Sequence, residues 1–297
     1  MHVLLPDTKD LIELIERSDP VSPDNFAEWL LARDFRIALT FTNVSEFADT
    51  IRSANDVLYV RSILQKLEGL PCRYLREVTI EGEEIRRAIA ASDSGDEPER
   101  ADPYVSRWDW TFTKWGERPP AEMIVNYQIA DMIFDLRGPD HRRGTRERQA
   151  LGAITADRAV PRKQRLGPRQ SLTTALAKKI QFWGLEKPKV GLEAFGKWIY
   201  ADPSRCPGLR LAWELFQALV SNEADVLQES DVADNAHFPA IPYVDYATLD
   251  RRMTGYCRDI GRKLGKVNAR ADYGTRVFRN LAELMAVVDS ETGVRTG

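Results

Sequence analysis

The chain has 297 residues, 29% of them charged, and a formal net charge of −3. That length is enough to bury a substantial core as one large domain or as a domain with an insertion. Because the charges nearly balance, the electrostatic field of the whole chain selects no class of binding partner. No apolar run approaches membrane-spanning length, and residues 1–10 lack the basic start and the long apolar core of a signal peptide.

The cysteines also limit the class of protein. Cys72, Cys206 and Cys257 stand far apart, and no CxxC pair occurs. This spacing argues against a disulfide framework and against a structural zinc site. We therefore expect a cytoplasmic protein without a membrane partner. The sequence does not decide between a monomer and a homodimer.

The first elements place an acid at a strand-to-helix junction. Residues 3–5 form a short apolar strand that Pro6 ends, and Asp7 and Thr8 open an amphipathic helix over residues 9–17. Two interpretations of Asp7 remain open. It is either the N-cap of that helix, a role such residues often fill, or a functional carboxylate.

A second acid follows the next predicted strand. After a helix over residues 23–33, an apolar strand over residues 36–42 leads into a helix that Asn43 or Ser45 would cap. Glu46 would lie in the first turn, where the helix dipole favours a carboxylate, so capping explains it without chemistry. The alternation continues through the next helix and strand, which predicts an α/β fold with a mainly parallel sheet.

The middle of the chain differs in character. Residues 91–102 are polar, acidic and rich in helix breakers, which predicts a flexible linker. Trp108, Trp110 and Trp115 follow closely, and packing onto the main domain is favoured over base stacking. Residues 121–136 carry apolar side chains at helical intervals, as a core-facing helix would.

A basic tract follows. Residues 137–169 hold ten Arg or Lys against three acids, and we interpret this excess as a track for a polyanion rather than as a solvated loop. Together with two arginines near the end of the chain, the candidate nucleic-acid contacts are Arg142, Arg143, Arg146, Arg162, Lys163, Arg165, Arg251 and Arg252. Further helices are predicted over residues 171–183, with Ser171 as the cap, and over residues 192–200 and 209–221.

Several more acids lie between residues 231 and 253, in the stretch DVADNAHFPAIPYVDYATLDRRM. Asp234 and His237 are one helical turn apart, so both can point from one face of a short helix. A structural histidine bonded to a backbone carbonyl is the favoured interpretation of His237.

An extended segment is predicted next, over residues 238–244, because Pro239 and Pro242 break helices. Asp245 and Asp250 then fall close to the end of a predicted strand, where open α/β sheets bind ligands. A solvated acidic surface is the alternative.

These pieces together resemble a known family. The opening VLLPDTKDLIELI, the strand followed by NVSEFA, and the late D-x-x-H…PYVD…TLDRRM are similar to the pattern of bacterial PIN-like domains in the PIN/FEN nuclease superfamily, over roughly residues 1–90 and 205–288. The resemblance implies a three-layer αβα domain, discontinuous over residues 1–90 and 205–297, around a central, mainly parallel sheet. Residues 91–204 would then be a linker plus a mostly helical, Arg-rich insertion.

The resemblance also implies a site. Asp7, Glu46, Asp234 and Asp250 would converge as catalytic carboxylates and metal ligands, with Asp245 as a further ligand. Asp231 competes with Asp234 for the third position, and Pro6 and Lys9 depart from the family's commoner pattern around Asp7. Such a set of hard oxygen ligands suits Mg²⁺ or Mn²⁺ better than zinc.

The implied activity is metal-dependent endonucleolytic hydrolysis of phosphodiester bonds, with RNA favoured over DNA. The family's bacterial members include toxins, RNA-processing enzymes and anti-phage effectors, and the sequence does not choose among these roles. Two alternatives stay open. One is a non-catalytic nucleic-acid-binding or scaffold protein of the same fold. The other is a haloacid dehalogenase-type phosphatase, which normally has Asp or a hydroxyl residue where this chain has Lys9.

Overall fold

A six-stranded sheet organises the protein in the computed structural model, which describes residues 1–16, 22–48, 54–105, 144–227 and 235–292. The strand order is β4-β3-β2-β1-β5-β6. The neighbours from β3 to β6 are all parallel, whereas β4 is antiparallel to β3. The strands are β1 (His2–Leu5), β2 (Phe35–Thr40), β3 (Cys72–Leu75), β4 (Tyr104–Val105), β5 (Tyr246–Thr248) and β6 (Val277–Phe278).

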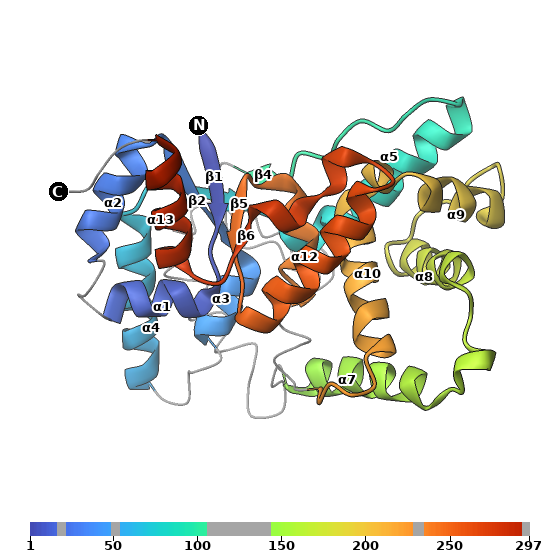
Figure 1. Cartoon of the computed structure of the whole chain (residues 1–297), viewed down its shortest axis with the longest axis horizontal. Coiled ribbons are helices and arrows are strands. Elements are labelled where there is room, and N and C mark those ends of the chain that lie inside the picture. Colours follow the sequence, from blue (N-terminus) through green and yellow to red (C-terminus); the bar gives the residue numbers. More distant parts are fainter. Residues whose placement is uncertain (17–21, 49–53, 106–143, 228–234, 293–297) are drawn as a thin grey trace.

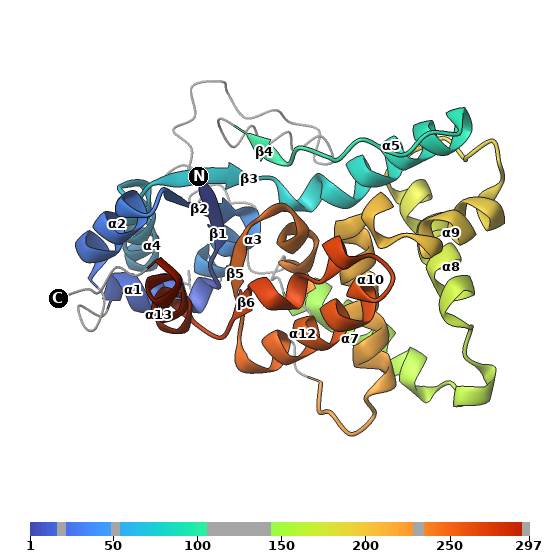
Figure 2. The same ribbon diagram turned by 45° about the horizontal axis from the view of Figure 1, so that its top comes forward.

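Helices cover both faces of this sheet (Figures 1 and 2). The α-helices are α1 (Thr8–Glu16), α2 (Pro23–Ala32), α3 (Phe41–Ala48), α4 (Ala54–Glu68), α5 (Ile80–Ser94), α7 (Gly144–Ala159), α8 (Pro168–Phe182), α9 (Leu192–Ala201), α10 (Pro207–Ser221), α12 (Arg251–Gly265) and α13 (Leu281–Thr292). The 3-10 turns are η1 (Glu77–Thr79), η2 (Arg162–Gln164), η3 (Pro203–Arg205), η4 (Phe238–Tyr243), η5 (Ala269–Ala271) and η6 (Tyr273–Arg276). The prediction of an α/β fold with a mainly parallel sheet is confirmed.

Strand alternation explains the two layers of helices. Side chains of successive strand residues point to opposite faces, so Leu4 joins the core beneath α1, α2, α3, α4 and α13. Val3 and Leu5 join the opposite core, beneath α10 and α12. Because both faces of the central strands β1 and β2 are buried, these two strands are largely apolar, as is typical of parallel sheets. Each buried aliphatic side chain contributes about 1.5–3 kcal/mol.

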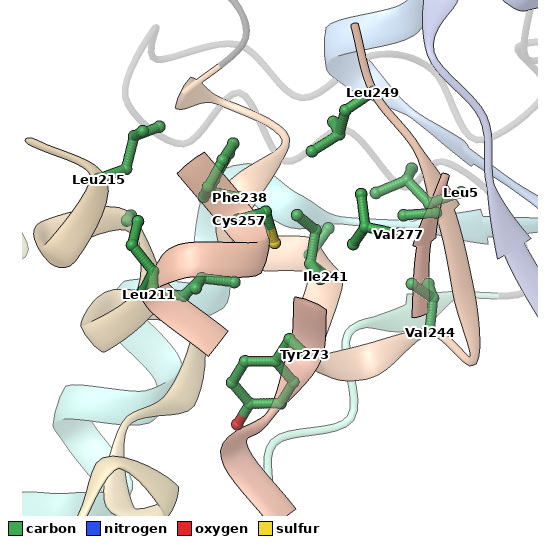
Figure 3. Packing of buried hydrophobic residues seen from close by; sticks show 14 of the residues in the cluster. Leu5, Leu211, Leu215, Phe238, Ile241, Val244, Leu249, Cys257, Tyr273 and Val277 are labelled. Atoms are coloured by element: carbon green, nitrogen blue, oxygen red, sulfur yellow. The ribbon is translucent and has the colours of Figure 1, made fainter. Parts of the chain in front are cut away.

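The second core contains the segment that was expected to be extended. Residues 238–243 instead form the 3-10 helix η4, with every residue buried. Pro239 stands in its first turn, where a missing N–H costs nothing, and the tighter turn also accommodates Pro242. Figure 3 shows Phe238 and Ile241 close to Cys257 of α12, with Leu211 of α10 in the same cluster. Tertiary burial therefore decides the conformation of this segment.

A third core joins the middle of the chain to the main body. Leu172 and Leu176 of α8 and Phe195 of α9 pack with Ile85 of α5 and Leu209 of α10. The four helices lie side by side at the end of the molecule away from α2 (Figures 1 and 2). Residues 144–204 are thus mostly helical and share a core with helices of the main body, whereas β4, which also falls within residues 91–204, belongs to the sheet.

Several local predictions differ from the structure. The segment expected to be a linker begins inside α5, which continues to Ser94 and ends at Gly95 with a left-handed φ of 82°. Ala101, in the same segment, is buried. Helix α8 starts at Pro168 with Gly167 as N-cap, so the prediction that Ser171 is the cap is wrong. The three tryptophans at 108, 110 and 115 and the helix expected over residues 121–136 lie outside the described residues.

Candidate functional site at the carboxyl edge of the sheet

The site follows from the strand order. β1 lies between β2 and β5, so the chain leaves β1 toward one side of the sheet and later returns on the other. Ligands of open α/β sheets bind at such a switch point, beyond the carboxyl ends of the strands. Asp7 follows β1, α3 with Glu46 follows β2, and Asp250 follows β5.

Asp7 is the N-cap of α1. Its Oδ1 accepts the Lys9 N–H at 2.8 Å, and its carbonyl accepts the Leu11 N–H. Its own N–H donates to Oγ1 of Thr248 at 2.9 Å, which ties the end of β1 to the end of β5. Burial raises the pKa of the Asp7 carboxyl. The His237 charge lowers it, and the charges of Glu46 and Asp250 raise it further. Asp7 therefore lies within electrostatic reach of all three groups.

The start of α3 is fixed by a reciprocal cap. The Asn43 N–H donates to Oγ1 of Thr40 at 3.1 Å, while Oδ1 of Asn43 accepts the Thr40 N–H at 3.0 Å. The Asn43 amide also donates to the Pro6 carbonyl and to Oγ1 of Thr8. Asn43 is fully buried, so this one side chain joins the ends of β1 and β2. Asn43 thus completes the cap from inside the helix, and the side chain of the other candidate, Ser45, is not described.

Glu46 consequently lies in the second turn of α3, because the helix begins at Phe41. The prediction that it occupies the first turn is wrong, and helix capping does not explain it. Its Oε2 lies 3.6 Å from Nε2 of His237, and the two side chains are 18% and 3% exposed. Glu46 is therefore one half of a nearly buried ion pair.

His237 is protonated near neutral pH. Burial disfavours the imidazolium, but the pairing with Glu46 and the charges of Asp7 and Glu77 outweigh it and raise the pKa to about 9. The favoured interpretation, a histidine bonded to a backbone carbonyl, differs from what is observed. Among the described residues its Nδ1 has no hydrogen-bond partner, and Nε2 faces a carboxylate.

Asp250 caps α12 in the way that Asp7 caps α1. Its Oδ1 accepts the Met253 N–H at 2.6 Å, and its carbonyl accepts the Thr254 N–H. It is only partly buried, and its charge raises the pKa of Asp7. The capping carboxylates of two helix N-termini therefore lie within electrostatic reach of each other at the carboxyl edge of the sheet.

Asp245 lies elsewhere. It precedes β5, and its Oδ2 accepts the Val3 N–H at 2.8 Å. Three residues of extended chain, about 10 Å, separate it from Thr248, which contacts Asp7. The expectation that Asp245 lies beside the other acids does not hold, because it stands at the opposite end of the strand.

The sequence did not indicate two further buried carboxyls at this edge. Glu77, which follows β3, is 2% exposed, and its Oε1 accepts the Thr42 N–H and hydroxyl at 2.6 and 2.8 Å. Asp10 in α1 is 7% exposed. The spacing of three from Asp7 to Asp10 was the available signal, since it places both acids on one side of a helix start.

The oxygen-rich donor set suits a hard divalent cation such as Mg²⁺ or Mn²⁺. Asp10 Oδ2 is buried and without a hydrogen-bond partner in the part of the chain that is described. Within the same ranges, however, no three His, Cys, Asp or Glu side chains are grouped so as to hold a metal ion. Asp234 and its competitor Asp231 lie outside those ranges.

The basic candidates divide into two groups. Arg165 donates to the carbonyls of Val160 and Arg158, and it pairs with Glu223, as Arg162 does. Arg252 lies 3.5 Å from Asp225. These three arginines therefore make internal contacts that hold loops and helix ends.

Lys163 and Arg251 are exposed, and so is Arg162 beside its contact with Glu223. Arg142 and Arg143 lie outside the described residues, and for Arg146 only the place in α7 is described. Of the eight candidate nucleic-acid contacts, the structure thus describes the side chains of four arginines and one lysine.

Comparison with models of protein families, with curated proteins and with solved structures found no match for this chain. Among the described residues, no helix combines the length and the apolar character needed to cross a bilayer. The fold and the site define an α/β protein with several carboxylates at the carboxyl edge of a mainly parallel sheet.

Proposed function

We propose that this protein is a metal-dependent nuclease of the PIN-like type that hydrolyses phosphodiester bonds, with RNA favoured over DNA as substrate. One observation carries the proposal. Asp7, Glu46 and Asp250 come from three distant parts of the sequence, and the charges of the latter two act on the Asp7 carboxyl at a switch point of the sheet. Carboxylates brought together in this way repel one another unless a cation compensates them.

The residues that would hold the ion are Asp7, Asp250, Glu46 and Asp234. A bound divalent ion supplies an activated water and neutralises charge on the phosphoryl oxygens. The chain itself supplies orientation. The Lys9 and Met253 N–H groups fix the carboxyls of Asp7 and Asp250 before any substrate arrives.

A cleavage assay tests the proposal. Purified protein is incubated with end-labelled single-stranded RNA and DNA in Mn²⁺, in Mg²⁺ and in EDTA. Endonucleolytic products that need the metal are expected, and Asp7→Asn should abolish them. Asp24→Asn is the matched control, because Asp24 is an exposed acid in the first turn of α2. Undiminished cleavage by the Asp7 variant would rule out this site.

A second candidate function is supported by the ion pair between Glu46 and His237. A protonated, buried imidazole already compensates Glu46 without a metal ion, as a non-catalytic nucleic-acid-binding or scaffold protein would allow. The two candidates differ in one measurement. RNA binding that persists in EDTA, with no Mn²⁺ uptake and no cleavage, would favour the non-catalytic protein.

A further inference from the structure

Asp10 is the acid at this edge whose charge the fold leaves least compensated. It is the third residue of α1, and its side chain points inward, with 7% of the residue exposed. Oδ2 has no hydrogen-bond partner among the described residues. A buried carboxylate oxygen without a partner costs several kcal/mol at this depth, so its retention calls for an explanation.

The neighbours of Asp10 are oxygens. The Thr248 side chain lies close enough to the Asp10 carboxyl to lower its pKa, and its hydroxyl accepts the Asp7 N–H at 2.9 Å. Thr248 is fully buried at the carboxyl end of β5. One side chain therefore stands beside both aspartates at the start of α1.

Among the groups that shift the pKa of the Asp10 carboxyl, none is a buried base that could compensate its negative charge. Burial raises its pKa to about 7. The Thr248 side chain lowers it, Asp7 and Glu13 raise it, and Lys9 lowers it. The Lys9 side chain is 77% exposed, so water screens its charge.

We propose that Asp10, together with Asp7 and the Thr248 hydroxyl, binds a divalent cation on the buried side of Asp7, at the start of α1. The inference rests on the proposed nuclease function, because it extends that site inward from Asp7. Two carboxylates and a hydroxyl are hard oxygen donors of the kind that Mg²⁺ and Mn²⁺ take. Asp10 would then be a ligand in addition to the four acids named above.

Mn²⁺ binding, measured by calorimetry on chelator-stripped protein without nucleic acid, tests the inference. Asp10→Asn keeps the shape of the side chain and should weaken binding by about tenfold or more. Glu13→Gln, one turn further along the same helix, should bind as the wild type does. Asp10→Asn should also unfold in urea at the same or higher concentration in EDTA at pH 8, because it removes a buried ionised group.

Further variants keep the test decisive. Thr248→Ala should weaken binding, whereas Thr248→Ser, which retains the hydroxyl, should not. This pair also replaces Asp10→Asn should that variant fail to fold. Wild-type affinity in Asp10→Asn or Thr248→Ala, with binding lost in Asp7→Asn and Asp250→Asn, would overturn this inference alone. Absence of Mn²⁺ uptake by the wild type would overturn both it and the proposed function.

Discussion

Nε2 of His237 lies 3.6 Å from Oε2 of Glu46, in a pair that joins the segment before η4 to the second turn of α3. The acids Asp7 and Glu77 act on the same imidazole. The histidine is thus a buried cation among the acids at the carboxyl edge of the sheet. It stabilises the apo form of a site whose carboxylates would otherwise repel one another.

The first prediction concerns the pH dependence of stability. The pKa of His237 is raised from 6.5 to about 9 on folding. The folded state therefore binds the proton more tightly, so the contribution of this group is complete below pH 6.5 and is lost as pH rises through 9. Urea unfolding between pH 6 and 9.5 should show this decline for the wild type and a shallower one for His237→Gln. His2→Gln, at an exposed position, should follow the wild type. Equal slopes for the wild type and His237→Gln would contradict the pairing.

The second prediction separates capping from catalysis at Asp250. Asn is as good an N-cap as Asp, so Asp250→Asn should keep the bond from the Met253 N–H and change the free energy of unfolding by less than about 0.5 kcal/mol. Metal-dependent cleavage should fall by about 100-fold or more, because a neutral amide is a poor ligand. Rates and unfolding curves of the same preparations give both quantities.

The neighbouring arginine provides the comparison for that experiment. Arg251 is exposed, so Arg251→Ala should weaken RNA binding while leaving turnover at saturating RNA close to the wild-type value. Equal losses of turnover in the two variants would show that Asp250 has no special role.

The third prediction concerns Glu84, which belongs to α5 and contacts the start of α10. This buried carboxylate accepts the N–H groups of Gly208 and Leu209 at the start of α10, and the hydroxyl of Tyr243. In Glu84→Gln the amide NH₂ would face a donor, so unfolding at pH 8 should become easier by about 1–3 kcal/mol. Glu186→Gln, at an exposed acid, should be neutral in the same urea titration.

Glu84 also has a pH signature. Burial raises its pKa from 4.5 to about 7, against the hydrogen bonds from Tyr243, Leu209 and Gly208 that lower it. The folded state then holds the proton more tightly than the unfolded state. The wild-type free energy of unfolding should therefore receive a contribution from this group that falls between pH 4.5 and 7. Glu84→Gln should lack that component, and an identical profile would show that the three donors keep the carboxyl ionised.

Local patterns predicted the elements better than their contacts. The apolar run of β1, ended by Pro6 and followed by Asp7, indicates a strand, a break and a cap from neighbouring residues alone. Helix α10 was expected over residues 209–221 and spans Pro207–Ser221. Its cap by Glu84 comes from 124 residues away in the sequence, and no local pattern carries that information.

In the site, too, local patterns predict the elements better than the contacts between them. That acids after β1, β2 and β5 lie at one edge follows from the geometry of parallel strands. Thr248 acts on the Asp10 carboxyl and Thr42 donates to Glu77, and a periodic pattern in the sequence predicts neither of these long-range contacts. The prediction for Asp245 is wrong because β5 has only three residues, so acids close together in the sequence lie at opposite ends of the strand.

The basic tract gives a prediction about stability. Arg158 donates from Nε and one NH₂ group to the Leu219 carbonyl, and from the other to the Asp225 carbonyl. It therefore holds the carboxyl end of α10 and the turn beyond it against α7. Arg158→Met should lower the free energy of unfolding by about 1–3 kcal/mol, because these carbonyls lose a charged donor. RNA affinity of the folded protein should not change.

The last prediction concerns Lys163, which lies in the same basic tract as Arg158 but is exposed. Its side chain is exposed within η2, so Lys163→Met should leave urea unfolding unchanged within about 0.5 kcal/mol. If it binds a phosphate, one counterion fewer is released by the variant, and the slope of log affinity against log salt should become shallower by about 0.7 for single-stranded RNA. Fluorescence anisotropy at several salt concentrations, with a labelled RNA in EDTA, measures that slope without cleavage. A slope that Lys163→Met leaves unchanged would place the RNA away from η2, because a lysine that neutralises a phosphate must contribute to counterion release.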